Sequence, residues 1–518
     1  MRHRRSRRPR RGASGVDVDA ALDLVGGVLK WLGPAFLAPA AVAVGAGEPP
    51  WPFVLAGAIT SAVGIALDRL TDDRHADRIG PREGFLVVAL VWLLVPAFGA
   101  LPFLLGDVPQ LSSPVDAYFE AMSGFTATGA TVLGQIDGVG QAMLFWRQLS
   151  HWLGGMGIIV LAVAVLPRLR VGGRRLLQAE LAGPAEIEPL SATIRQTARR
   201  LWGLYVGLSV VATLVLAALG WLGLDRTMNF FDAFSYSTSA VALGGFSPRD
   251  GSASTLAPVT QWVLCVTMLI SGINFLRLFR LLVQRQVRAV SRDEELRLYL
   301  ALFAAAAVLL LVEVLADGGI GIGTAVRTTT FQAISTMTTT GLAVGNYTHW
   351  GALAAMTLLL LMFIGASAGS TGGSIKVVRH LLLFRIVRRE LLTAAHTDMV
   401  VPVRVNGVAV DERSLRSAIG FVALYLLTFA LGSLGLVIVA RQARSGLDVF
   451  EAIGASASCL GNVGAGFGFA GPFGSYAPFS DLSKLILTLQ MWMGRVEIIP
   501  VMILLTPSFW RGPGGGRS

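Results

Sequence analysis

Four short segments of the chain combine small polar residues with a glycine in a way that suits the binding of a dehydrated cation. They occupy residues 126–131, 240–247, 338–342 and 461–466. Glycine adopts backbone angles that other residues avoid, so successive carbonyl groups in such a segment can point in one direction. Four of these tips around one axis would present rings of carbonyl oxygens that replace the hydration shell of a cation.

The segments that precede the tips support this interpretation. They span residues 115–128, 227–243, 323–340 and 447–463, and each is too short and too rich in Ser and Thr to cross a membrane. Each reads as an amphipathic half-helix, whose partly negative C-terminal end would face the axis and favour a cation. No acidic side chain occurs in a tip, which argues against a carboxylate ring for divalent ions. A helix-linking turn explains any one tip, but four tips at matching places indicate a pore.

Apolar helices must hold these tips in place. Hydrophobic residues make up 53% of the 518 residues and charged residues only 14%, whereas about a quarter of a soluble protein is charged. Apolar runs of about 18 or more residues recur along the chain, as membrane-spanning helices require. We predict ten spans, at 21–45, 52–68, 84–105, 141–167, 203–223, 257–281, 297–316, 351–392 (interrupted), 415–440 and 482–508.

The predicted fold is an all-α polytopic membrane protein with four helix–pore-loop–helix repeats related by pseudo-fourfold symmetry. Such repeats place irregular backbone at membrane depth, where it survives only if it lines a cavity or is buried in protein. We divide the chain into a basic tail, two N-terminal helices and four pore repeats, at 1–20, 21–83, 84–175, 203–290, 297–395 (with the interrupted helix) and 415–510.

Positive charge fixes the expected orientation. Seven of the first eleven residues are arginine, a tail that could bind nucleic acid but that, beside an apolar segment, better explains topology. If the N-terminus is cytoplasmic and the spans alternate, most of the 43 Lys and Arg residues fall on the inner side, as the positive-inside rule requires. We therefore expect a multi-pass protein that contacts lipid, has a cytoplasmic N-terminus and binds no nucleic acid.

The sequence gives little support for an enzyme. Cys265 and Cys459 lie in apolar or glycine-rich surroundings, and two such residues cannot build a disulfide framework or a cysteine metal site. The six histidines are scattered, no HExxH or P-loop lysine sequence occurs, and there is no GxSxG strand-turn. We expect no enzymatic activity and no bound cofactor, and the only metal that we expect is a transported cation at the tips.

Two features of the apolar regions suggest a gate. Arg495 lies in the last predicted span, where an arginine costs about 2.5–3.5 kcal/mol unless it faces water or a partner. Residues 365–374 are small and interrupt the eighth span, because each glycine costs about 1 kcal/mol relative to alanine in a helix. A buried arginine–carboxylate pair and a tight helix–helix interface are the structural alternatives to an electropositive plug and a flexible loop. His151 and Trp152 are expected to be interfacial anchors at the outer boundary.

Several strings carry a resemblance to a known family. They are SGFTATGAT (123–131), HWLGGMGIIV (151–160), STMTTTG (335–341), SAGSTGGSIK (367–376), CLGNVG (459–464) and GRVE (494–497). From about residue 84 to its end, and in its two additional N-terminal helices, the chain resembles the TrkH branch of the Trk/Ktr/HKT superfamily. The resemblance implies a gated potassium pore in a bacterial inner membrane, a homodimer, and regulation by a cytosolic nucleotide-binding ring of the TrkA type.

The resemblance also implies roles for individual residues of this chain. Potassium would bind at a filter of Ala127, Thr128, Gly129, Ala242, Leu243, Gly244, Thr339, Thr340, Gly341, Asn462, Val463 and Gly464. The gate would consist of Arg495 and the loop residues Gly369, Ser370, Thr371, Gly372 and Gly373. The chain departs from the family at Leu243, where threonine is common, and at Ala465, where proline is usual. Gly129 favours potassium, because serine at this place marks sodium-preferring relatives.

Two alternatives stay open at this point. An ion-coupled potassium or sodium symporter would need paired ionisable groups at mid-membrane, for which Arg495 and Glu497 are the only candidates. Regulation by nucleotide would need another chain, because the loops 168–200 and 392–414 are too short for a dinucleotide-binding fold. We expect such a chain to dock on basic residues in or beside these loops, such as Arg174, Arg175, Arg388 and Arg389.

Overall fold

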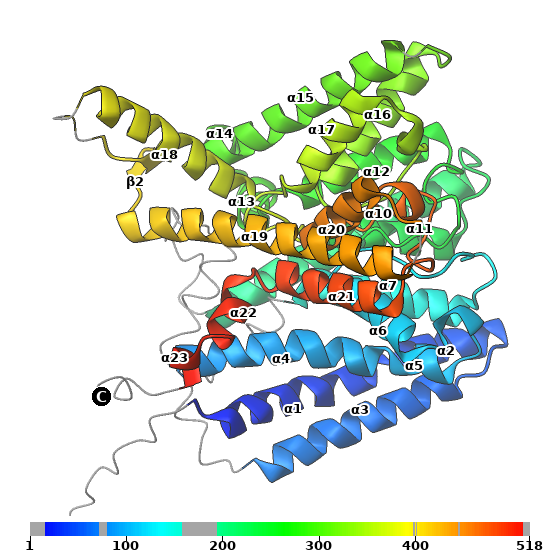
Figure 1. The fold of residues 1–518 in the computed structure, drawn as a ribbon. Coiled ribbons are helices and arrows are strands. Elements are labelled where there is room, and N and C mark those ends of the chain that lie inside the picture. The colour runs from blue at the N-terminus through cyan, green and yellow to red at the C-terminus, as the bar shows by residue number, and fades with distance from the viewer. Residues whose placement is uncertain are drawn as a thin grey trace, which may run out of the picture.

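The computed structural model of the chain is built almost entirely of helices (Figure 1). It describes residues 16–71, 80–157, 194–316, 318–396, 399, 401–443 and 446–510. The basic residues predicted to orient the N-terminus and the predicted docking residues Arg174 and Arg175 lie outside these ranges. Among the described residues, the only strands form a small hairpin of β1 (Arg404–Val405) and β2 (Val408–Ala409).

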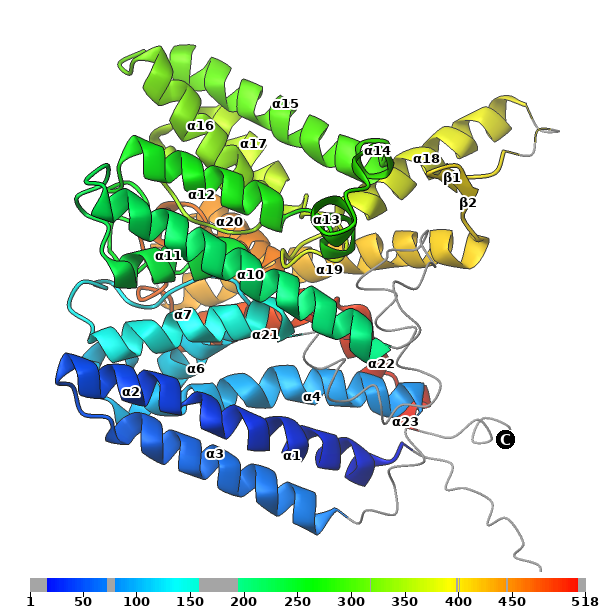
Figure 2. The same ribbon diagram turned by 180° about the vertical axis from the view of Figure 1, so that it is seen from behind.

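Three N-terminal helices form one edge of the molecule, as Figures 1 and 2 show. They are α1 (Val18–Ala35), α2 (Leu37–Ala46) and α3 (Trp51–Leu70). Phe36, two residues after Pro34 of α1, separates α1 from α2, but Val18–Ala46 together still form one helix that could span a membrane. Helices α1 and α3 meet through glycines, because a Cβ on Gly64 would lie 2.9 Å from the carbonyl oxygen of Gly26. Small residues allow helices to approach this closely in a membrane.

The order helix, short helix, glycine tip and helix then occurs four times. The first set contains α4 (Pro81–Gly99), α5 (Leu101–Leu105), η2 (Pro109–Leu111), α6 (Pro114–Phe125) and α7 (Gln141–Gly155). The second contains α10 (Ile194–Trp221), α11 (Phe230–Ala242), α12 (Pro258–Ser271), α13 (Phe275–Leu282) and α14 (Val287–Ser291).

The third set contains α15 (Glu294–Ala316), α16 (Ile322–Met337), η4 (Tyr347–His349), α17 (Ala352–Met362) and α18 (Val377–Ala395). The fourth contains α19 (Glu412–Ala443), α20 (Val449–Gly461), η5 (Gly468–Ala470), α21 (Asp481–Arg495), α22 (Ile499–Leu504) and α23 (Pro507–Trp510). The helices of the third set lie at the edge opposite to α1–α3, and α18, the hairpin and α23 lie at one common end (Figures 1 and 2).

The four short helices α6, α11, α16 and α20 coincide with the predicted half-helices. Side-chain caps start two of them, since Asn229 accepts a hydrogen bond from the amide of Asp232 and Asp448 forms a capping box with Glu451. Such caps satisfy amide groups that the first turn of a helix leaves without partners. These helices have 12 to 16 residues, too few to cross the apolar core of a bilayer.

Six described helices are long and apolar enough to cross a membrane, and a bent pair raises the number to seven. The predicted count of ten stays a prediction, as do the domain boundaries. The interruption of the eighth span is confirmed, because residues 363–376 separate α17 from α18.

Two other spans were wrongly predicted to be continuous. The sixth bends by 106° between α12 and α13, and the last breaks after Arg495, where Glu497 and Ile498 adopt positive φ. A residue with positive φ cannot continue an α-helix, so the chain must turn there.

Candidate functional site

Each half-helix ends in the same backbone turn. In every tip, the amide of a central residue donates to the carbonyl of a serine five positions earlier. The four bonds join Thr128 to Ser123 (2.9 Å), Gly244 to Ser239 (3.0 Å), Thr340 to Ser335 (2.8 Å) and Val463 to Ser458 (2.8 Å). Such a bond closes a helix and turns the chain away from its axis.

Positive φ angles flank the central residue in all four tips. The residue before it is Ala127 (52°), Leu243 (55°), Thr339 (62°) or Asn462 (54°). The residue after it is a glycine with φ between 79° and 94°, namely Gly129, Gly245, Gly341 and Gly464. Non-glycine residues adopt positive φ only at a cost of order 1–3 kcal/mol, and such conformations cluster at functional sites.

This pattern moves the second tip by one residue from its predicted register. Leu243, Gly244 and Gly245 are equivalent to the triplets 127–129, 339–341 and 462–464. Ala242 is the last residue of α11, and Leu243 takes the place of Ala127 rather than that of the middle threonine. The sequence contains two adjacent glycines at this tip, and the structure identifies the second as the one that needs positive φ.

The four tips close into a ring. A Cβ on Gly129 would lie 2.3 Å from the carbonyl oxygen of Gly244, and a Cβ on Gly245 would lie 1.9 Å from that of Thr340. The series continues from Gly341 to Val463 (2.0 Å) and returns from Gly464 to Thr128 (2.3 Å). Each tip therefore packs its glycine against the central carbonyl of the next, and only glycine leaves room for this contact.

The central carbonyl groups of this ring are available to a ligand. Among the residues that the structure describes, no donor forms a hydrogen bond with the carbonyl oxygens of Thr128, Gly244, Thr340 or Val463. Buried carbonyl groups are almost always paired, so an unpaired set of four in a ring is unusual. Beyond the tips lies a cavity of about 80 Å³ that all four tips line, together with Arg147 and Asp250. The arrangement can coordinate a cation that enters from this cavity.

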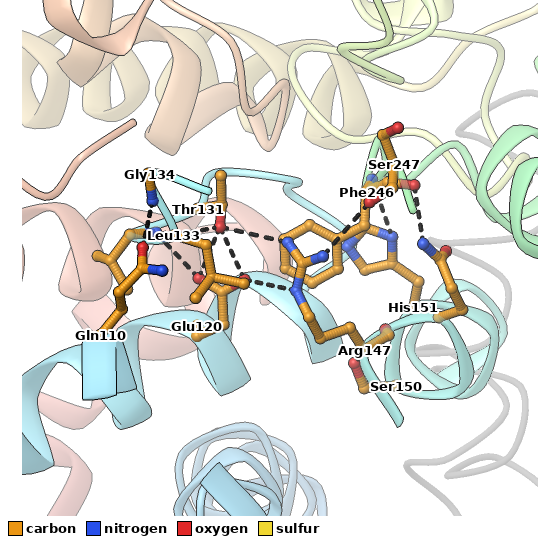
Figure 3. Close-up of polar contacts among 12 residues, drawn as sticks. Gln110, Glu120, Thr131, Leu133, Gly134, Arg147, Ser150, His151, Phe246 and Ser247 are labelled. Carbon is orange, nitrogen blue, oxygen red and sulfur yellow. Dashed lines mark hydrogen bonds and ion pairs between the residues drawn. The ribbon is translucent and has the colours of Figure 1, made fainter. Parts of the chain in front are cut away.

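A buried ion pair holds the first and second tips in place (Figure 3). Glu120 of α6 and Arg147 of α7 are 2.7 Å apart with both side chains fully buried. Glu120 also accepts hydrogen bonds from the hydroxyl of Thr131 (2.9 Å) and the amide of Val132 (3.0 Å). The guanidinium of Arg147 lies 4.0 Å from the ring centre of Phe246. Residues that follow both tips are therefore fixed to one charged pair.

His151 lies beside the second tip and not at the outer boundary. Its side chain is fully buried in α7, and its ring stacks on that of Phe246 with 4.0 Å between the centres and an interplanar angle of 7° (Figure 3). The prediction of an interfacial anchor was wrong because helix α7 turns this side chain toward the tips. Trp152, which is half-buried, donates instead to the hydroxyl of Ser209 in α10 (3.0 Å).

The predicted gate loop lies against the side of the ring where the half-helices end. The amide of Gly373 donates to the hydroxyl of Thr339 (2.7 Å), and the hydroxyl of Thr371 donates to the carbonyl of Val241 (3.1 Å). A Cβ on Gly373 would lie 2.4 Å from the carbonyl oxygen of Gly461. The loop of residues 363–376 thus contacts the second, third and fourth tips.

Arg495 bridges this loop to the first set of helices. Its guanidinium donates to the carbonyl oxygens of Thr371 (2.9 Å), Gly154 (2.7 Å) and Gly155 (3.1 Å). Glu497 pairs with Arg379 of α18 at 2.6 Å. The positive charge of Arg495 is therefore held by backbone carbonyls beside the loop, and the carboxylate of Glu497 ties the last span to α18.

The middle of the loop is also tied to a buried charge cluster, which was not predicted from the sequence. Glu295, at the start of α15, accepts a hydrogen bond from the amide of Ala368 (2.7 Å) and pairs with Arg277. Arg277 also pairs with Asp293 (2.8 Å), and Asp293 accepts from the amide of Asn406 in the β hairpin (2.9 Å). A charged residue at the very end of an apolar span was the available signal.

Comparison with known proteins places the chain in a family. Residues 52–511 match the family model TrkH, described as a cation transport protein. The Trk system potassium uptake protein TrkH of Salmonella typhimurium is 37% identical over 443 residues, which is 85% of this chain and 88% of that protein. TrkG of Escherichia coli, also a Trk system potassium uptake protein, is 31% identical over 442 residues, or 85% of this chain and 88% of that one.

A solved structure agrees with these relatives. The crystal structure of the potassium transporter TrkH from Vibrio parahaemolyticus aligns with a TM-score of 0.82 and 33% identity. The alignment covers 96% of this chain and all of that one. The chain is thus a polytopic membrane protein that belongs to the TrkH family of cation transport proteins.

Proposed function

We propose that this chain takes up potassium through a gated pore whose selectivity filter is the ring of four tips. The observation that carries the proposal is the ring of unpaired carbonyl oxygens at Thr128, Gly244, Thr340 and Val463. Backbone carbonyls replace the hydration shell of potassium without the charge of a carboxylate ring. The relatives, which are potassium uptake proteins and a potassium transporter, agree with this ion.

The gate consists of the 363–376 loop and Arg495. A cation that leaves the ring meets this loop, because hydrogen bonds join it to Thr339 and to the carbonyl of Val241. The guanidinium of Arg495 adds a positive charge at the same place and holds Thr371 to the end of α7. Removing this side chain eliminates the charge and the bridge together, so the pore should open.

The proposal is tested by cation flux into proteoliposomes that contain the purified protein and a gradient of K⁺, Rb⁺ or Na⁺. The variant Arg495→Ala should carry K⁺ and Rb⁺ faster than the wild type and should exclude Na⁺. Arg416→Ala is the matched control, because Arg416 is exposed on α19 and forms no hydrogen bond or ion pair with the described residues of the loop. Silent Arg495→Ala protein, or equal K⁺ and Na⁺ flux, would contradict the proposal. K⁺ flux that requires a gradient of a second ion would instead favour the symporter.

The pore works with other chains in this proposal. We place the N-terminus and the end that carries α18 in the cytoplasm of a bacterial cell, with two copies of the chain forming a homodimer in the inner membrane. A cytosolic nucleotide-binding ring of the TrkA type would then dock near α18 and the β hairpin. Contacts that run from Asn406 through Asp293, Arg277 and Glu295 to Ala368 would transmit its movement to the loop.

Two predicted docking residues differ in their surroundings. Arg388 is exposed, whereas Arg389 forms ion pairs with Glu390 (3.1 Å) and Glu412 (2.5 Å). Arg388→Glu should therefore weaken co-purification of the ring without harming the fold. Arg226→Glu makes the same change in an exposed loop before α11 and should leave co-purification intact. Equal recovery of the ring with both variants would refute docking at α18.

A further inference from the structure

The second tip lacks a side chain that the other three tips possess. The central residues of the first, third and fourth tips are Thr128, Thr340 and Val463, all buried. The hydroxyls of Thr128 and Thr340 each bond to a second threonine, at 2.6 Å and 2.7 Å. Gly244 has no atoms to fill the corresponding space. Since empty space beside a buried carbonyl would let it move, something else must occupy this place.

The ring of His151 occupies it. A Cβ built on Gly244 would lie 2.4 Å from Nδ1 of His151, 2.7 Å from Cγ and 2.9 Å from Cε1. These three nearest atoms all belong to the imidazole and none to a backbone. A side chain at residue 244 and the ring of His151 therefore exclude each other.

Contacts with Phe246 hold the ring of His151 in place. The imidazole stacks on Phe246 (Figure 3), whose amide hydrogen points at Nδ1 over a long distance of 3.5 Å. One turn earlier, the side-chain amide of Gln148 donates to the carbonyl of Phe246 (3.1 Å). The guanidinium of Arg147 lies over the ring of Phe246. Packing, more than hydrogen bonding, thus holds His151 against the second tip.

The backbone does not require glycine at residue 244. The φ angle of Gly244 is not in the positive region, and the equivalent positions carry threonine or valine. Gly245 differs, because its φ is 83° and its Cβ would lie 1.9 Å from the backbone carbonyl of Thr340. The two neighbouring glycines are therefore needed for different reasons, one for His151 and one for the ring.

We propose that His151 is a positioning residue of the filter, which takes the place of the missing side chain at Gly244 and thereby holds the second carbonyl for potassium over sodium. The proposal rests on the proposed function, because it assigns selectivity to the same ring. It concerns the volume and position of the imidazole. Sodium is smaller than potassium, so a carbonyl that can move inward would favour sodium.

The test is a pair of single variants and their combination, made in the Arg495→Ala background so that the pore is open. His151→Ala empties the space, and Gly244→Thr overfills it. Each should lower the ratio of K⁺ to Na⁺ flux about tenfold, which corresponds to about 1.4 kcal/mol. His151→Ala/Gly244→Thr should restore most of this ratio, because the new side chain fills the space that the imidazole leaves. The effects of substitutions at residues in contact are not additive.

Two controls make the result specific. His151→Ala/Gly245→Thr should not recover, because the clash of residue 245 is with the backbone of Thr340. His151→Phe keeps a ring and loses the nitrogens, so it should keep the ratio if packing is what matters. The thermal midpoint of each purified variant identifies any that fail to fold, and for a failed single variant the recovery of that midpoint in the double variant replaces the flux readout.

The outcomes separate the two proposals. Unchanged selectivity in both single variants, or a double variant no better than the product of the single effects, would overturn the role of His151 while the selective background stands. Absence of selective K⁺ flux in the Arg495→Ala background would overturn the filter and, with it, the role of His151.

Discussion

Serine in place of Gly129 should destroy the selectivity of the ring. An added Cβ would lie 2.3 Å from the carbonyl oxygen of Gly244, whereas an ordinary C···O contact is about 3.3 Å. The first two tips must therefore separate by about 1 Å. The φ of Gly129 is 85°, so the backbone adds of order 1–3 kcal/mol of strain, and overpacking adds about 1–3 kcal/mol more.

Together the strain and the overpacking cost at least about 2 kcal/mol. This exceeds the roughly 1.4 kcal/mol that corresponds to a tenfold change in an equilibrium constant. In the Arg495→Ala background, Gly129→Ser should thus lower the ratio of K⁺ to Na⁺ flux at least about tenfold. Gly138→Ser is the matched control, because Gly138 lies between the same tip and α7 with nothing within 4 Å of its Cβ. If Gly129→Ser keeps the selectivity of the control, the ring is not the filter.

Two further predictions concern the charged residues around the ring. Glu120→Gln or Arg147→Met leaves one buried charge without its partner and should lower the free energy of unfolding by about 3–5 kcal/mol. Asp68→Asn, in an exposed pair with Lys30, should change it by less than about 1 kcal/mol. Similar losses for the buried and the exposed pair in denaturant titrations would contradict the account. Glu295→Gln should loosen the 363–376 loop at Ala368 and raise the K⁺ flux of protein that retains Arg495. Glu294→Gln, which loses contacts to Arg385 and Asn406, should not raise this flux. Equal flux in the two variants would show that the bond between Glu295 and Ala368 does not restrain the gate.

The sequence was sufficient to predict the half-helices and the tips because their physical requirements are local. A semi-polar stretch of 12 to 16 residues between long apolar helices can form a helix but cannot span, and a glycine must follow where the chain turns. The small residues at 365–374 likewise predict an interruption. Each of these features depends on neighbours in the chain, and each lies where it was expected apart from the one-residue shift of the second tip.

Features that depend on contacts between distant segments were not predictable. The register of the second tip follows from the approach of Gly245 to the backbone of Thr340, 95 positions away. His151 was assigned to the boundary because a single sequence does not reveal which face of α7 meets the tips. The break near Gly272 occurs without a nearby proline. For the break near Glu497, Pro500 in the first turn of α22 was a local signal, and the Arg379–Glu497 pair adds a tertiary contact there.

The most direct test of the central claim is an experimental structure of the protein in Rb⁺, with the anomalous scattering of the ion used to locate it. The account predicts an ion on the axis of the ring, surrounded by the carbonyl oxygens of Thr128, Gly244, Thr340 and Val463. A ring that is well ordered but contains no Rb⁺, or Rb⁺ bound only elsewhere in the molecule, would contradict it.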